Sequence, residues 1–284
     1  MEMKTVLLAV LWISLFLTVF EYGLWSKVED LLYVVHRPGL LVKSLLAIFV
    51  IVPLVVIALL QVIDAPRMVE VSLVALAISP IPPMLPKKVF KPGAVSSYAM
   101  GLLSTVSLIA IVAVPLEIKL LEYYFARQFN MPLRTLVMTI FLAILVPIAL
   151  GFSVRRYLPK LAQKIEKAVQ WSAIGLLGAA TLMIIGAKMP EMLSLIGNGT
   201  IFVIVCFIVV GLVAGHLLGG PEEENRGVLA AAASSRHPGI ALAILGANFP
   251  EQNFGATILL YMLVNLIVGI PYIRWQAKRT ISAT

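Results

Sequence analysis

Long apolar runs alternate with short polar breaks along the whole chain. A helix that crosses a bilayer needs about 20 mostly apolar residues, because its backbone groups find no water to bond inside the hydrocarbon. Proline, glycine and charged residues in the breaks are typical of helix ends. Nine such segments are predicted, at residues 4–25, 39–62, 67–86, 93–116, 133–154, 168–187, 197–219, 225–247 and 254–275.

Composition supports a membrane protein. Hydrophobic residues make up 61% of the 284 positions, charged residues make up 13%, and the mean hydropathy is +1.01. Soluble domains hold roughly 45–50% apolar and about 25% charged residues, and no soluble core of this length could bury so much apolar surface. The expected fold is an all-α polytopic membrane protein that forms one unit in the bilayer. The single cysteine, Cys206, excludes a disulfide framework and a cysteine-based metal site.

The net charge of +8 follows from topology. The basic residues lie in short segments between apolar runs and not on one amphipathic face, so no nucleic-acid partner is expected. With the N-terminus outside, 15 lysines and arginines fall in inside segments and 6 in outside segments. The positive-inside rule therefore predicts an integral protein of the inner (plasma) membrane, with an outside N-terminus and a cytoplasmic C-terminus.

Two of the nine segments are interrupted. The first holds four prolines between Pro80 and Pro86, and such a stretch cannot continue a helix. The second holds Arg236, His237, Pro238 and Gly239 in the middle of an otherwise apolar run. An arginine near the bilayer centre costs at least about 2.5–3.5 kcal/mol on insertion scales, so Arg236 is expected to face a cavity.

Interrupted helices at corresponding positions of two halves indicate the binding site of a secondary transporter. The third and eighth segments are five apart, so they cross the membrane in opposite directions, as an inverted repeat requires. We expect a first repeat at residues 1–125, with four helices and its broken helix at about 67–92. The second repeat, residues 126–284, would hold five helices and a broken helix at about 225–247.

The chain resembles the bile acid:sodium symporter family over most of its length. The resemblance is carried by Arg37-Pro38, by the proline-rich break that precedes Gly93, by the stretch from Ser104 and Thr105 to Ser107, and by the run Ser235–Ala241. It implies two inverted repeats arranged as a panel domain and a core domain, with two broken helices that cross in the core. The first helix of the family is missing from this nine-helix pattern.

The resemblance also implies that the sodium ligands of the family are replaced. The glutamate, glutamine and asparagine of its second broken helix fall on Ala232, Arg236 and His237. Its hydroxyl ligands fall on or beside apolar or aromatic residues such as Tyr98 and Leu102. No carboxylate is expected in this core, and a fixed cation about 4 Å from a sodium ion would add roughly 4 kcal/mol of repulsion at an effective dielectric constant of 20. No bound metal or cofactor is therefore expected.

Fixed positive charge at the breaks predicts a small organic anion as the solute. Arg236, with Lys87 or Lys88, would attract the anion, and His237 would titrate near neutral pH, so protons are a candidate coupling ion. All four of these residues have alternative structural roles. Arg236 could bond backbone carbonyls where the breaks cross, and His237 could be a hydrogen-bonded core histidine. Lys87 and Lys88 could be cytoplasmic flanking charges. The other candidate cavity residues are Pro83, Ser104, Thr105, Ser234, Ser235 and Asn265.

Glycines in apolar segments predict close contact between helices, because a missing side chain lets two backbones approach. Gly175, Gly186, Gly197 and Gly199 are expected to pack in this way.

An intramembrane enzyme is disfavoured, and we expect no catalytic residues. Neither His-Glu-x-x-His nor Gly-x-Ser-x-Gly occurs in the sequence, and the interruptions themselves, residues 79–88 and 232–241, hold no carboxylate. Ser235 and His237 are the only conceivable catalytic pair, and residues two apart point to different helix faces. A solute-gated channel, or a sensor that binds an organic anion without transport, remains an alternative, because the same cavity would serve either purpose.

Overall fold

The computed structural model describes residues 2–85, 96–126, 128–130 and 132–282, and within these ranges the chain is helical, with no strand. Two elements, η1 and η2, are short π-helical turns. The elements are α1 (Glu2–Trp25), α2 (Val28–Leu31), α3 (Pro38–Leu46), η1 (Ala47–Ile51), α4 (Val52–Val62), α5 (Arg67–Ala77), α7 (Ser97–Phe125), α8 (Leu133–Ile140), η2 (Phe141–Leu145), α9 (Val146–Tyr157), α10 (Pro159–Ser194), α11 (Thr200–Leu218), α12 (Glu223–Ser234), α13 (Pro238–Asn248) and α14 (Gly255–Ser282).

Eight helices in the described ranges are long and apolar enough to cross a membrane, which confirms the all-α polytopic prediction. The predicted third segment, 67–86, is not one of them. Its helix α5 ends at Ala77, and a non-helical stretch follows as far as Met84. The predicted eighth segment is helical on both sides of an interruption at residues 235–237, between α12 and α13. Both breaks therefore fall where the sequence pattern predicts them.

Several predicted boundaries differ from the structure: α10 and α14 each run seven residues past their predicted ends, to Ser194 and Ser282. α10 begins at Pro159, inside the basic stretch that is expected to be a break, because Pro159 suits the first turn and the lysines, alanines and glutamates after it favour a helix. α7 continues through Pro115 to Phe125, nine residues beyond the predicted end at 116. This extension places Glu117 inside the helix bundle, where it is 9% exposed.

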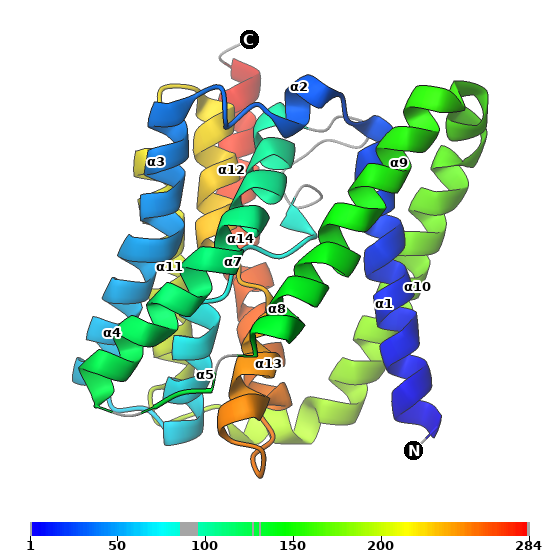
Figure 1. The fold of residues 1–284 in the computed structure, drawn as a ribbon. Helices are drawn as coiled ribbons and strands as arrows, with labels where there is room; N and C mark the ends of the chain where they lie inside the picture. Colours follow the sequence, from blue (N-terminus) through cyan, green and yellow to red (C-terminus); the bar gives the residue numbers. More distant parts are fainter. Residues whose placement is uncertain (1, 86–95, 127, 131, 283–284) are drawn as a thin grey trace.

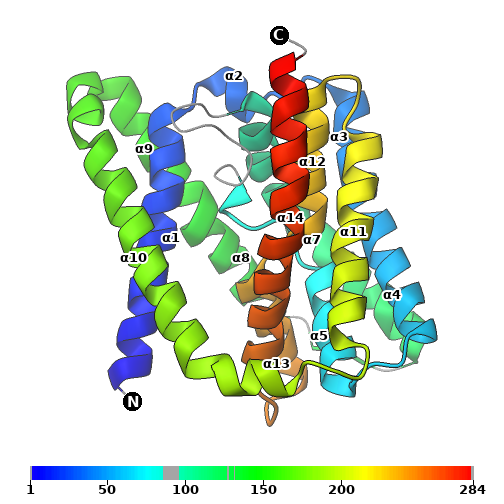
Figure 2. The ribbon, with the colours of Figure 1, turned by 180° about the vertical axis from the view of Figure 1, so that it is seen from behind.

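The helices form two groups, which Figures 1 and 2 show side by side. We call α1, α8, α9 and α10 the panel; α1 packs against both α9 and α10. The other helices form the core, in which α11 packs on α12, α4 and α14, and α13 packs on α5. Both views place the start of α1 and the end of α14 at opposite ends of the molecule. Both views also show that α5 begins at the end that holds the start of α1, and that α7 begins at the other end.

Close backbone contacts occur at glycines other than the expected ones. Gly23 of α1 meets Gly151 of α9, and a Cβ atom on either would collide with the other helix's backbone. Gly211 and Gly215 of α11 meet α12 in the same way. The packing prediction is wrong for Gly175, Gly186 and Gly197, where an added Cβ would have nothing within 4 Å. At Gly199, just before α11, the Cβ would lie 2.8 Å from the carbonyl oxygen of Asp64, which belongs to the connection between α4 and α5 and not to a helix.

Candidate functional site

The two interruptions meet in the core. The backbone N–H of His237 donates a hydrogen bond to the Pro80 carbonyl at 2.8 Å. Both partners belong to non-helical backbone, since Pro80 lies after the end of α5 and His237 has extended dihedral angles just before α13. Backbone groups freed by one break are therefore bonded by the other, which is how unwound chain is tolerated at membrane depth.

The Arg236 side chain is held at this crossing by hydrogen bonds. Its side chain is 2% exposed, and its Nη1 donates to the Ile48 carbonyl at 3.0 Å and to the Ser79 carbonyl at 3.2 Å. The Ser79 carbonyl is free because the helix ends there. The Ile48 carbonyl lies in the π-turn η1, where backbone hydrogen bonds join residues five apart. The Val52 N–H, for example, donates to the Ala47 carbonyl. Five residues after Ile48 comes Pro53, which has no N–H to donate.

The alternative structural role of Arg236 is therefore confirmed in part. One nitrogen of its guanidinium bonds backbone carbonyls, but the group carries five donors. Within the described part of the chain, Nε and Nη2 are buried and have no hydrogen-bond partner. Arg236 thus links the two breaks and still has free N–H donors that could bond an anionic group.

Glu117 of α7 is a functional candidate that the sequence pattern did not predict. The predicted segment 93–116 ends one residue before it, and the expectation of a core without a carboxylate is wrong. Glu117 and Arg236 are close enough to interact electrostatically. Neither carboxylate oxygen has a hydrogen-bond partner among the described residues. The helical character of residues 117–125, with Leu, Ile, Lys and Glu, is the signal that could have revealed it.

His237 caps helix α13. Its Nδ1 accepts a hydrogen bond from the Ile240 N–H at 3.3 Å, and the residue is 4% exposed. Its Nε2 is buried and has no hydrogen-bond partner among the described residues. The ring is thus a hydrogen-bonded core histidine on one side and an unpaired nitrogen on the other.

Ser234, Ser235 and Asn265 form one polar cluster at the end of α12. The Ser234 carbonyl accepts from the Tyr261 hydroxyl at 2.6 Å and from Asn265 Nδ2 at 2.7 Å, while Ser235 Oγ donates to Asn265 Oδ1 at 3.3 Å. These bonds satisfy the orphan carbonyl that the interruption leaves. The three predicted residues are therefore brought together, and Asn265 has a structural role at the break.

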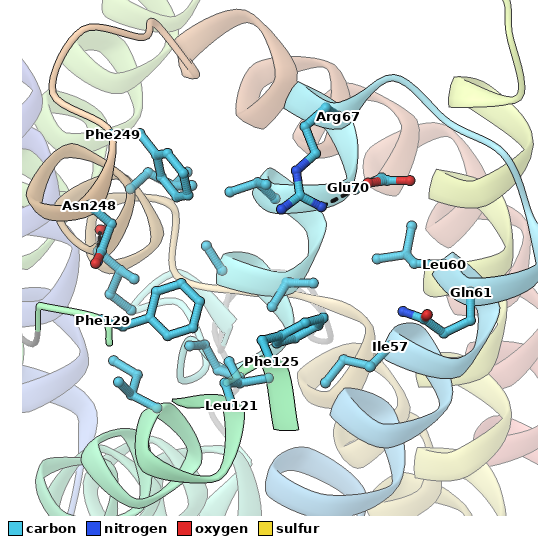
Figure 3. Close-up of a pocket in the computed structure, with 17 residues that line it drawn as sticks. Ile57, Leu60, Gln61, Arg67, Glu70, Leu121, Phe125, Phe129, Asn248 and Phe249 are labelled. Atoms are coloured by element: carbon cyan, nitrogen blue, oxygen red, sulfur yellow. Dashed lines mark hydrogen bonds and ion pairs between the residues drawn. The ribbon is translucent and has the colours of Figure 1, made fainter. Parts of the chain in front are cut away.

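A first cavity of about 190 Å³ lies between α4, α5, α7 and α13. Figure 3 shows its aromatic wall, formed by Phe125, Phe129 and Phe249, and the Arg67–Glu70 ion pair near it, with N–O 3.3 Å. Ile78 and Ile118 also line it, and they directly adjoin Ser79 and Glu117 in sequence. The cavity thus borders the crossing.

A second cavity of about 280 Å³ lies on the other side of the second break, between α11, α12 and α14. Ser234, Ser235 and Asn265 line it, with Arg274 farther along α14. α5 and α13 border the first cavity, whereas α12 and α14 border the second. The crossing therefore lies between helices that line two different cavities.

The remaining predicted residues are not brought to the crossing by any observed contact. Ser104 Oγ donates to the Leu31 carbonyl at 3.1 Å and so joins α7 to the end of α2. Thr105 is half-buried, Pro83 is buried, and neither lines a cavity described above. Lys87 and Lys88 lie outside the described residues. Within the described ranges, no three histidine, cysteine or acidic side chains gather as they would around a metal ion.

The chain matches a known protein family. The model of the Sodium Bile acid symporter family matches residues 12–195, from α1 to the end of α10. A search of curated proteins gives no match. The family match spans well over half of the chain and stops before the second break, so Arg236 and His237 lie outside it. The chain is an integral membrane protein with a symporter-like architecture, and it belongs to the sodium bile acid symporter family.

Proposed function

We propose that this protein is a sodium-independent secondary transporter that moves a small organic anion by alternating access. The observation that carries the proposal is the buried guanidinium of Arg236 at the crossing of two unwound segments, with two nitrogens that have no hydrogen-bond partner among the described residues. Membership of a symporter family supports transport as the general activity.

The chemistry of Arg236 favours an anion. Its planar guanidinium presents donors in a fork that matches a carboxylate or a sulfonate, and such charge-assisted bonds are about twice as strong as neutral ones. In a low-dielectric core, the unpaired donors gain most from a charged acceptor. A sodium ion would be repelled by the same charge.

The cavities suggest the route. The first cavity is lined by the ends of α4, α5 and α13 that lie at the end of the molecule where α1 begins. In the proposed orientation, with the N-terminus outside the inner (plasma) membrane, this cavity faces outward. The second cavity leads from Ser235 toward Arg274, near the cytoplasmic end of α14. An anion would reach Arg236 from either side as the core moves against the panel.

Counterflow in proteoliposomes tests the proposal. Vesicles loaded with an unlabelled anion would be diluted into labelled anion, for a set of small carboxylates, keto acids, sulfonates and bile acids. A carrier shows saturable exchange with at least one of them. Unsaturable conductance would instead indicate a channel, and binding without flux would indicate a sensor; either result contradicts the proposal.

A further inference from the structure

Glu117 is an acidic side chain buried in the core with no hydrogen bond. It is 9% exposed, and both carboxylate oxygens are unpaired among the described residues. The next acid on the same helix, Glu122, accepts from the Phe129 N–H at 2.9 Å. Burying a carboxylate without hydrogen bonds or a paired charge is costly, so such a residue indicates either a counter-charge or a proton.

Both possibilities are present at Glu117. Arg236 interacts with it electrostatically, yet the two side chains share no hydrogen bond. Nη1 of Arg236 bonds the Ile48 and Ser79 carbonyls, while Nε and Nη2 have no partner among the described residues. Leu121, one helical turn after Glu117 and so on the same face, lines the first cavity together with Ile118. The cavity that reaches Ile118 and Leu121, next to Glu117 on α7, offers a route for a proton from water.

We propose that Glu117 is the proton-binding residue that couples proton uptake to anion binding at Arg236. The inference rests on the proposed anion site. Without solute, the Glu117 carboxylate is the counter-ion of the guanidinium. When an anion occupies the free donors of Arg236, two negative charges would face one positive charge, and a proton from water on Glu117 restores neutrality. One monovalent anion and one proton then bind together, and both leave on the other side.

The neighbouring titratable groups do not serve this purpose. His237 accepts the Ile240 N–H at Nδ1, so a proton there would break the cap of α13. Tyr261 donates to the Ser234 carbonyl. On the elements around α7, Asp30 of α2 accepts from Ser97 at the opposite end, Arg134 of α8 is exposed, and the acids of α12 lie in its first turn. At the first cavity, Glu70 is paired with Arg67.

Proton uptake on anion binding tests the proposal in the purified full chain. Benzenesulfonate is a suitable probe, because its sulfonate stays charged at every pH used and contributes no proton of its own. Equilibrium dialysis gives the bound anion, and a pH indicator in weak buffer gives the proton count. We expect about one proton per bound anion in the wild type. Glu117→Gln should bind the anion with no proton uptake, while the control Glu122→Gln on the same helix should match the wild type.

Proton uptake that persists in Glu117→Gln, or anion binding without proton uptake in the wild type, would overturn the inference. A failure of the anion site itself shows separately, as a wild type that neither binds nor exchanges any anion. In that case infrared spectroscopy can still report the protonation of Glu117. Its carboxyl band is identified as the band that Glu117→Gln removes. That band should change when Arg236→Gln removes the counter-charge, and an unchanged band would contradict the coupling of the two residues.

Discussion

His237 and Pro80 are joined by a backbone hydrogen bond of 2.8 Å, the direct link between the two interruptions of the core. Because Arg236 beside it also bonds the Ser79 carbonyl, adjacent residues of one break hold adjacent residues of the other. The second interruption thus supplies the donors, and the first supplies the carbonyl acceptors. A shift of either break would leave the Ser79 and Pro80 carbonyls unpaired, so the two should move as one unit during transport.

Replacing Arg236 by alanine should strongly reduce exchange and weaken the fold. Arg236→Ala removes the donors for an anion and leaves the Ile48 and Ser79 carbonyls unpaired, at a cost of about 1–3 kcal/mol for each buried group. We expect counterflow to fall by roughly 10-fold or more. The melting temperature of the purified protein should fall as well.

Arg236→Lys separates the two effects, since it keeps the charge and loses the planar fork. Its exchange activity should lie between those of the wild type and Arg236→Ala. Wild-type counterflow in a folded Arg236→Ala variant would contradict an anion site at this residue.

Sodium should leave the transport rate unchanged. A sodium ion about 4 Å from the guanidinium would be repelled by roughly 4 kcal/mol, which is about a 1,000-fold loss of occupancy. Uptake by proteoliposomes should therefore be equal in sodium and in N-methylglucamine buffers at one pH. A steep rise of the initial rate with sodium would refute this expectation.

Gly215 should tolerate no side chain. A Cβ atom there would collide with the Ala230 backbone of α12, and overpacking of this kind costs about 1–3 kcal/mol. Gly215→Ala should lower the melting temperature. Gly175→Ala is the matched control in α10, where nothing lies within 4 Å and alanine favours a helix by up to about 1 kcal/mol. Equal melting temperatures for both variants would argue against the α11–α12 contact.

The proposed orientation can be tested with single cysteines in a Cys206→Ser background. Glu251 lies in the loop between α13 and α14, and Lys160 lies at the start of α10; both are exposed and at opposite ends of the molecule. With an outside N-terminus, a membrane-impermeant maleimide should label Glu251→Cys in intact cells. Lys160→Cys should react only after the cells are opened, and the reverse pattern would invert the topology.

The architecture was largely predictable from the sequence because lipid imposes a length on apolar helices and proline removes a backbone donor. Eight of the nine segments correspond to helices that can span a bilayer. Both breaks lie at the expected prolines, and the structure joins them at Pro80 and His237. A ninth crossing and the repeat boundaries remain predictions.

The partners of Arg236 were not predictable in the same way. Glu117 is in the core only because α7 passes through Pro115, and tertiary packing decides whether a helix continues past a proline. The Ile48 carbonyl is free because a π-turn and Pro53 coincide, and only the backbone geometry reveals this. The glycine prediction failed since a glycine in an apolar run faces lipid as readily as a neighbouring helix.

The backbone contact between Gly23 and Gly151 limits where this protein can bend. α1 and α9 touch with no side chain between them, so neither can slide without a collision, and α10 packs against both. These helices should keep their shape while the rest of the molecule tilts. The strain of that tilt then falls on the three connections that link them to the other helices, from α1 to α3, from α7 to α8 and from α10 to α11. Two of these connections hold residues with left-handed backbone, Ala126 and Asn198. Substitutions that make these connections more rigid should lower the transport rate without changing which solute the protein binds.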